Sequence, residues 1–215
     1  MTNIAKHQVF NLIILDESGS MASVKNVTMA GFNETVQTIQ GAQKKFPEQE
    51  HRVSLVTFNS MDIRTVLDNQ PAEALTLLTD GSYQPDGGTP LFDAMGRSLM
   101  RLEFQTEHLS DFTILVSILT DGHENASQEF SGSAIKAMID RLTEKGWTFT
   151  YMGANHNVEQ MASSLSIKSF LRFESTQEGM DELFRKDRNS RHKFYQKRSS
   201  GMSSKDAEKG FWDEE

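Results

Sequence analysis

Three oxygen-bearing side chains stand at alternating positions directly after an apolar run near the amino terminus. The run Val9–Leu15 leads into Asp16, Ser18 and Ser20, with Gly19 between the two serines. Residues two apart in an extended stretch share a face, so one carboxylate and two hydroxyls can converge on one point. Oxygen is the ligand type that Mg²⁺ prefers, in near-octahedral geometry and with some of its water retained. The spacing therefore predicts a site for a hard divalent cation.

Two later segments carry oxygen donors in comparable positions. Thr89 lies in a glycine-rich loop that opens a predicted helix, and Asp121 follows Phe112–Leu119, the most continuous apolar run of the chain. In sheets of parallel strands, binding sites form outside the carboxyl ends of the strands. We therefore expect Asp16, Thr89 and Asp121 to lie on one rim of a sheet.

Apolar runs alternate with helical patterns along the chain, which predicts an α/β fold. This fold is doubly wound and Rossmann-like, with a mostly parallel central sheet, helices on both faces and one antiparallel edge strand. The predicted strands are Val9–Leu15, Arg52–Phe58, Asp62–Leu67 (the more polar edge strand), Phe112–Leu119, Trp147–Met152 and Ser169–Phe173. The predicted helices are Val24–Phe46, residues 90–106, Ser133–Lys145, Val158–Ser164 and a stretch that begins at about Thr176.

The chain resembles the von Willebrand factor A (vWA) domain family in three motifs, which stand in the family's order. They are Asp16-Glu17-Ser18-Gly19-Ser20-Met21, Gly87-Gly88-Thr89-Pro90-Leu91 and Leu119-Thr120-Asp121-Gly122, and the resemblance extends over about Gln8 to Phe184. It implies a metal-ion-dependent adhesion site (MIDAS) that binds Mg²⁺ or Mn²⁺. In such a site Ser18 and Ser20 bind the cation directly and Thr89 binds directly or through water. Asp16 and Asp121 usually act through water and through hydrogen bonds to the groups around the ion.

The resemblance also implies what the ion does. The remaining coordination position of the metal accepts an Asp or Glu side chain from a protein partner. All five metal-site positions are intact in this chain. The sequence is more similar to the intracellular prokaryotic or phage branch of the family than to integrin-type adhesion domains.

Simpler interpretations exist for each motif and its neighbours. Ser18 and Ser20 can cap the following helix, and Asp121 with Gly122 can form an ordinary turn. Glu17 is expected to be solvated, with exclusion of anionic competitors as the alternative, and Met21 to pack. Asp93 suits a helix amino terminus, with an outer-shell role as the alternative. Asp86 is expected to be a turn residue. The loop residues His123, Glu124 and Asn125 are expected to line the ligand surface without binding the metal.

Composition limits the function classes. The chain has 215 residues and a net charge of −8, which argues against a general nucleic-acid binder. It has no cysteine, so disulfides and thiolate metal sites are excluded. No apolar stretch approaches the roughly 20 residues that span a bilayer, and Val9–Leu15 is too short for a signal peptide. These features predict a cytoplasmic protein that does not contact membranes.

Motifs for catalysis are missing from the sequence. The six histidines show no H-E-x-x-H spacing, and neither a Walker-type phosphate loop nor a nucleophile elbow occurs. The main hypothesis is therefore a metal-dependent protein-interaction module and not an enzyme. Two alternatives remain, a metal-dependent hydrolase that acts on an anionic substrate and a metal-free scaffold.

The carboxyl-terminal stretch differs in composition from the rest. Residues 185–198 are rich in Lys and Arg, Ser199–Ser204 is typical of a flexible linker, and the chain ends in Phe211-Trp212-Asp213-Glu214-Glu215. We expect a vWA-like domain over residues 8–184, then a basic helix end and flexible tail over 185–215. The basic stretch is interpreted as a solvated helix face, with an aromatic docking peptide at the chain end as the alternative.

Overall fold

Six strands form one sheet in the computed structural model, which describes residues 6–213. The strands are β1 (His7–Asp16), β2 (Gln49–Phe58), β3 (Ile63–Pro71), β4 (Phe112–Thr120), β5 (Thr148–Gly153) and β6 (Ser169–Arg172). Their order across the sheet is β3-β2-β1-β4-β5-β6. β3 pairs with β2 in the antiparallel sense and all other neighbours are parallel. The predicted doubly wound sheet with one antiparallel edge strand is confirmed.

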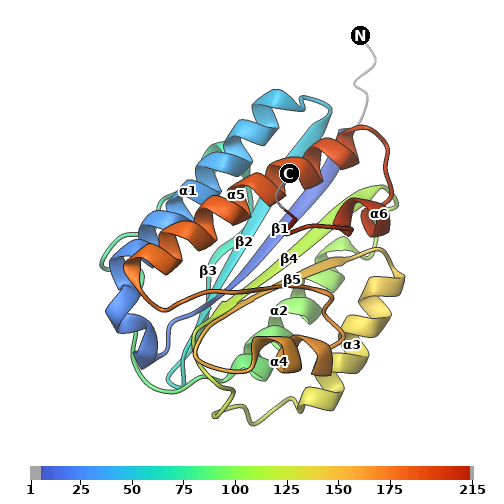
Figure 1. The fold of residues 1–215 in the computed structure, drawn as a ribbon. Helices are drawn as coiled ribbons and strands as arrows, with labels where there is room; N and C mark the ends of the chain where they lie inside the picture. Colours follow the sequence, from blue (N-terminus) through green and yellow to red (C-terminus); the bar gives the residue numbers. More distant parts are fainter. Residues whose placement is uncertain (1–5, 214–215) are drawn as a thin grey trace.

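Helices cover both faces of this sheet (Figure 1). They are α1 (Lys25–Lys45), α2 (Leu91–Thr106), α3 (Gly132–Glu144), α4 (Val158–Ser164), α5 (Gln177–Ser199) and α6 (Ser204–Glu208), with short 3₁₀ helices at Gly19–Val24 and Ala72–Ala74. One apolar core joins α1, α5 and α6 to one face of the sheet. A second core joins α2, α3 and α4 to the other face.

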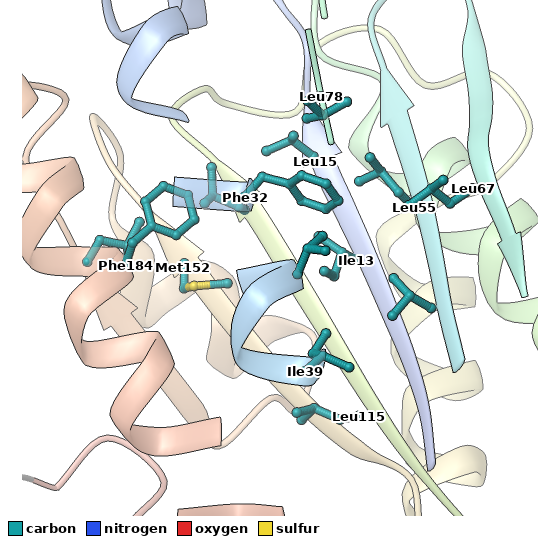
Figure 2. Close-up of a cluster of buried hydrophobic side chains, with 14 of the residues drawn as sticks. Ile13, Leu15, Phe32, Ile39, Leu55, Leu67, Leu78, Leu115, Met152 and Phe184 are labelled. Atoms are coloured by element: carbon teal, nitrogen blue, oxygen red, sulfur yellow. The ribbon is translucent and has the colours of Figure 1, made fainter. Parts of the chain in front are cut away.

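β1 lies at the centre and supplies both cores. Side chains alternate between the faces of a strand, and here Ile13 and Leu15 face α1 and α5 while Leu12 and Ile14 face the opposite helices. Figure 2 shows Ile13 and Leu15 among the side chains of Phe32 and other core residues. Leu15 pairs with Leu119, so β1 and β4 end at the same level of the sheet. The residues that follow the two strands are therefore neighbours.

α1 and α5 lie side by side on one face of the sheet (Figure 1). They approach closely at Gly31. A Cβ atom on Gly31 would stand 1.8 Å from the Phe184 ring, so any other residue there would have to displace this ring. This glycine fixes the distance between the two helices.

The carboxyl-terminal stretch differs from the predicted flexible tail. α5 continues unbroken to Ser199, and the segment after it packs against the domain through Ala207 and Phe211, both buried. The Phe211 ring centroid lies 5.9 Å from that of Phe194 on α5, which gives the tail an apolar partner that the sequence pattern does not reveal. Glu214 and Glu215 lie outside the described residues.

The solvated-face interpretation of residues 185–198 is wrong for Arg191. Its side chain is buried and donates from Nε to Asp187 Oδ2 at 2.6 Å and from Nη2 to Ser117 Oγ at 2.7 Å. Burial alone would lower the pKa of Arg191, but the adjacent Asp187 carboxylate raises it. Within residues 6–213, no helix combines the length and the apolar character needed to cross a membrane.

Candidate metal centre

Asp16 is the last residue of β1 and is fully buried. Its Oδ1 accepts a hydrogen bond from the backbone N–H of Ser18 at 2.7 Å, which turns the chain sharply after the strand. Ser18 stands at the start of the 3₁₀ helix but makes no side-chain capping hydrogen bond. Its Oγ instead lies 3.2 Å from Ser20 Oγ. The capping interpretation therefore fails for Ser18, and the two hydroxyls face each other.

The end of β4 joins this group from the neighbouring strand. Ser20 Oγ donates to Asp121 Oδ1 at 2.5 Å, and Thr120 Oγ1 donates to Asp16 Oδ2 at 2.5 Å. Two hydrogen bonds thus connect the first motif with the third across 101 and 104 positions of sequence.

Thr89 is brought in by the loop before α2. Its hydroxyl faces Gly122, where a Cβ atom would stand 2.9 Å from Thr89 Oγ1 and 3.7 Å from both Asp16 Oδ2 and Ser20 Oγ. Side-chain oxygens from three segments therefore surround one small space beside Gly122. We call Asp16, Ser18, Ser20, Thr89 and Asp121 the oxygen cluster, and the structure brings all five together.

The Thr89 loop is held from both sides. Asn125 Oδ1 accepts from the Thr89 backbone N–H at 2.8 Å, and Asn125 donates its own N–H to the Thr89 carbonyl at 3.2 Å. On the other side Gly19 donates its N–H to the Gly87 carbonyl at 3.0 Å. Gly87 has a positive φ of 70°, a conformation that glycine adopts readily. These contacts fix the position of Thr89 relative to Ser18 and Ser20.

The electrostatics of the cluster favour a cation. Burial raises the pKa of Asp16 to about 6, and nearby Asp121 acts in the same direction, while hydrogen bonds from Thr120 and Ser18 oppose the shift. A positive charge between the two carboxylates would remove this penalty. Tyr83 donates its hydroxyl to the Asp16 carbonyl at 2.6 Å, and burial raises the pKa of that phenol.

Glu17 is not the solvated side chain that the sequence predicts. It is buried and accepts from Arg64 Nη2 at 2.9 and 3.0 Å and from the backbone N–H of Gln84. Its carboxylate therefore joins the end of β1 to β3 and to the loop that leads to Thr89. Met21 is buried, as predicted for a packing residue.

Two other acids organise the loop after Asp121. Asp93 on α2 accepts three backbone N–H groups from residues 128–130 at 2.8 to 2.9 Å. Burial alone would raise the pKa of Asp93, but these three donors lower it. Glu124 accepts from the N–H groups of Phe92 and Ser127. Asp86 bonds the next N–H, that of Gly87, as a turn residue would.

Sequence reasoning missed three contributors to the site. Thr120 could have been found, because it precedes Asp121 in the third motif at the end of a buried strand. Tyr83 lies in a turn-rich passage, and Ser175, which donates to Asp121 Oδ2 at 3.1 Å, lies before α5. No sequence pattern marks Tyr83 or Ser175 as a site residue, because only the fold brings their loops to the same rim of the sheet.

The donor set suits a hard cation. Within residues 6–213 no group of three or more His, Cys, Asp or Glu side chains is placed to hold a metal, so a metal here depends on hydroxyl oxygens together with two carboxylates. The cluster offers only oxygen atoms, which fits the ligand preference of Mg²⁺ and Mn²⁺.

Comparison with solved structures finds related folds at low sequence identity. The pilus adhesin SpaC from Lactobacillus rhamnosus GG is similar over 90% of this chain and 31% of its own, with 14% identity and a TM-score of 0.61. The vWF domain of the type V pili tip protein Mfa5 from Porphyromonas gingivalis is similar over 85% of this chain and 95% of its own, with 10% identity and a TM-score of 0.55.

A third similar structure carries a metal. It is proximal thread matrix protein 1 from the mussel byssus with a zinc-occupied MIDAS motif, similar over 85% of this chain and 46% of its own, with 11% identity and a TM-score of 0.55. This chain thus spans less than half of that protein and about a third of SpaC, at 31%. At such identities the likeness shows the fold alone.

A search among curated protein sequences gives no match. The family model of the von Willebrand factor type A domain matches residues 12–186, which is more than half of the chain. The match includes all three motifs and the sheet that positions them. This chain therefore belongs to the von Willebrand factor type A domain family.

Proposed function

We propose that this chain is a divalent-metal-dependent protein-interaction module. In this proposal Ser18, Ser20 and Thr89 hold Mg²⁺ or Mn²⁺ directly, while Asp16 and Asp121 act through water. The bound ion captures an Asp or Glu side chain of a protein partner. The observation that carries the proposal is the convergence of five oxygen-bearing side chains from three segments on the space beside Gly122.

The types of donor explain why capture of an anion fits. Three of the five side chains are neutral hydroxyls. Only the two carboxylates, Asp16 and Asp121, can offset the charge of a divalent ion, and in this proposal both act through water and not as direct ligands. When bound, such an ion supplies an electrophilic position that an incoming carboxylate can fill. The protein's part is to keep the donors in place, and Asp16 is held by Thr120 and by the Ser18 N–H for that purpose.

The cytoplasmic location and the intracellular prokaryotic or phage origin belong to the same proposal. They are supported by the sequence resemblance described above. Neither affects the chemistry of the site.

The experiment that tests the function begins with metal binding. Mg²⁺ or Mn²⁺ at millimolar concentration should raise the Tm relative to EDTA, because a ligand of the folded state stabilises it by mass action. Ser18→Ala and Asp16→Asn should remove this increase. Ser23→Ala is the matched control, since this exposed serine of the same 3₁₀ helix bonds only a backbone carbonyl. An unchanged Tm for the wild type across both metals contradicts the proposal.

Partner capture is tested separately. Immobilised protein is incubated with lysate in Mg²⁺ and then washed with EDTA, and the released proteins are identified by mass spectrometry. The expected result is a partner that EDTA releases, that Ser18→Ala does not retain, and that loses binding when one of its own Asp or Glu residues is replaced. A partner retained equally by Ser18→Ala would show that the metal position is not used. If the protein hydrolyses generic phosphate esters and Asp121→Ala loses this activity, the interaction-module proposal is wrong and the protein is a hydrolase.

A further inference from the structure

A groove of about 700 Å³ lies between α1 and α5. Its lining comes from α1, from α5 and from the tail. The lining residues are Thr38, Gly41, Ala42, Arg185, Lys186, Arg188, Asn189, Ser190, His192, Lys193, Trp212 and Asp213. Figure 1 shows the two helices side by side on one face of the sheet. The described lining includes none of the five residues of the oxygen cluster, so this groove is a separate feature. We call it the α1–α5 groove.

The charge of the α1–α5 groove is opposite to that of the chain. The described lining carries four cationic side chains and one carboxylate, whereas the whole chain has a net charge of −8. The cations are Arg185, Lys186, Arg188 and Lys193, and the carboxylate is Asp213. A concentration of positive charge on an acidic protein attracts an anionic partner to this place.

Three of the groove cations, Arg188, Lys186 and Lys193, make contacts that are at least partly exposed. Arg188 meets Glu34 at 3.3 Å and Lys186 meets Glu182 at 3.0 Å, and in both pairs at least one side chain is about half exposed. Lys193 donates to the Asp213 carbonyl at 3.3 Å. Exposed ion pairs of this kind contribute little to stability, so their cations can turn to an incoming carboxylate at small cost.

Gly41 gives an independent indication that the α1–α5 groove is a binding site. A glycine inside a helix is less favourable than alanine, and Gly31 on the same helix is explained because its Cβ would meet the Phe184 ring at 1.8 Å. A Cβ on Gly41 would meet nothing within 4 Å. Gly41 lines the groove and is exposed, so the protein's own packing does not require a glycine there. A glycine at this position lets a foreign main chain approach α1 closely.

Trp212 also lines the groove. Its indole packs edge-on against Phe211 with ring centroids 4.9 Å apart, and its Nε1 is buried with no hydrogen-bond partner among the described residues. Tryptophan and arginine are also the residue types that dominate protein interfaces.

We propose that the α1–α5 groove binds an acidic segment of a partner protein, with its carboxylates on the α5 cations and its main chain over Gly41. The occupant is a peptide and not a nucleic acid for two reasons. The overall charge of −8 repels a long polyanion that extends beyond the groove. The small apolar residues Gly41 and Ala42 in the lining suit aliphatic side chains between the acids.

The experiment uses the two tryptophans of the chain. Trp147 is buried against Phe149, so Trp147→Phe leaves Trp212 as the single fluorophore, at the groove itself. The probe is a short peptide of repeated Glu-Glu-Leu units, titrated into the full chain in EDTA so that metal capture of carboxylates cannot contribute. The expected result is a shift of Trp212 emission with a micromolar dissociation constant that weakens at high salt. A Lys-Lys-Leu peptide and a DNA duplex serve as comparison probes.

Two variants and one control locate the binding. Gly41→Leu fills the groove without touching the protein's own packing, so it should keep or raise the Tm and weaken the peptide at least tenfold. Arg188→Glu should weaken it similarly. Lys136→Glu makes the same charge change on α3, which covers the opposite face of the sheet, and should leave binding unchanged. The proposal is overturned by absence of a Trp212 response, by equal weakening in Lys136→Glu, or by DNA binding more tightly than the acidic peptide.

Discussion

Thr89 and Gly122 face each other so closely that a Cβ on Gly122 would stand 2.9 Å from Thr89 Oγ1. Real Cβ atoms essentially never come that near, so the glycine keeps the space inside the oxygen cluster open. The same Cβ position lies 3.7 Å from Asp16 Oδ2 and from Ser20 Oγ. The backbone of Gly122 therefore forms one wall of the candidate metal centre.

Gly122→Ala tests this relationship with a single methyl group. We expect it to abolish the rise in Tm that Mg²⁺ or Mn²⁺ gives, because the methyl displaces Thr89 and occupies the space between the donors. Gly81→Ala is the matched control, since a Cβ there meets nothing within 4 Å. A Gly122→Ala variant with a full metal response would mean that the ion does not bind beside Gly122.

Thr120 leads to the second prediction. Its hydroxyl donates to the buried Asp16 carboxylate at 2.5 Å and accepts from the Gly122 N–H at 3.2 Å. Thr120→Val keeps the shape and removes the hydroxyl, which should lower the free energy of unfolding by about 2 kcal/mol and weaken the metal response. Urea unfolding with and without Mg²⁺ measures both effects.

Thr148 provides the control for Thr120. It is also a buried threonine at a strand position, but its hydroxyl has no hydrogen-bond partner among the described residues. Thr148→Val should therefore be neutral or stabilising, because no hydrogen bond is lost and a buried polar group is removed. Equal destabilisation by the two variants would argue against a specific role for the Thr120 hydroxyl.

The sequence was sufficient for features that depend on local pattern. Asp16 and Asp121 could be placed on one rim because each follows a buried strand, and parallel strands end together. The buried position of Glu17 could not be predicted, because its charge is compensated by Arg64, which lies far along the chain. The ion pair of Arg191 with Asp187 is local, but only the fold shows that this pair is buried and that Ser117 accepts a further hydrogen bond from Arg191. From sequence alone a charged side chain is predicted to be solvated, because the contacts that allow its burial are known only from the fold.

The stability of the fold should depend on pH through His51. Burial lowers the pKa of His51 to about 4, and nearby His7 acts in the same direction. The unfolded chain binds this proton near the ordinary pKa of about 6.5, whereas the folded chain does not until about 4. The contribution of neutral His51 to the free energy of unfolding is therefore fully present above pH 6.5. It is lost as the pH falls from 6.5 to 4, by up to about 3 kcal/mol at pH 4.

A His51→Phe variant checks this assignment, since phenylalanine can keep the edge-on contact with Tyr195 and cannot take up a proton. Its free energy of unfolding, measured by urea titration between pH 7 and pH 4, should decline less than that of the wild type. Carboxylates also titrate in this range, so only the difference between the two curves is diagnostic. Parallel curves would assign the acid sensitivity to other groups.

Phe211 decides whether the carboxyl-terminal segment is part of the core. Its ring is buried against Phe194, so Phe211→Ala should lower the free energy of unfolding by about 3 kcal/mol, the usual cost of removing a buried aromatic ring. Met202→Ala is the control in the same segment, because Met202 is exposed and should cost less than about 0.5 kcal/mol. Both values come from urea unfolding of the full chain.

The metal response separates the tail from the candidate metal centre. Phe211→Ala should keep the full rise in Tm with Mg²⁺, because every residue of the oxygen cluster precedes Gly122 in sequence, whereas Phe211 packs against Phe194 of α5. A cost below about 0.5 kcal/mol for Phe211→Ala would instead support the flexible tail predicted from composition. A lost metal response together with the expected destabilisation would mean that the position of α5, which carries Phe194 and follows Ser175, controls the Asp121 side of the cluster.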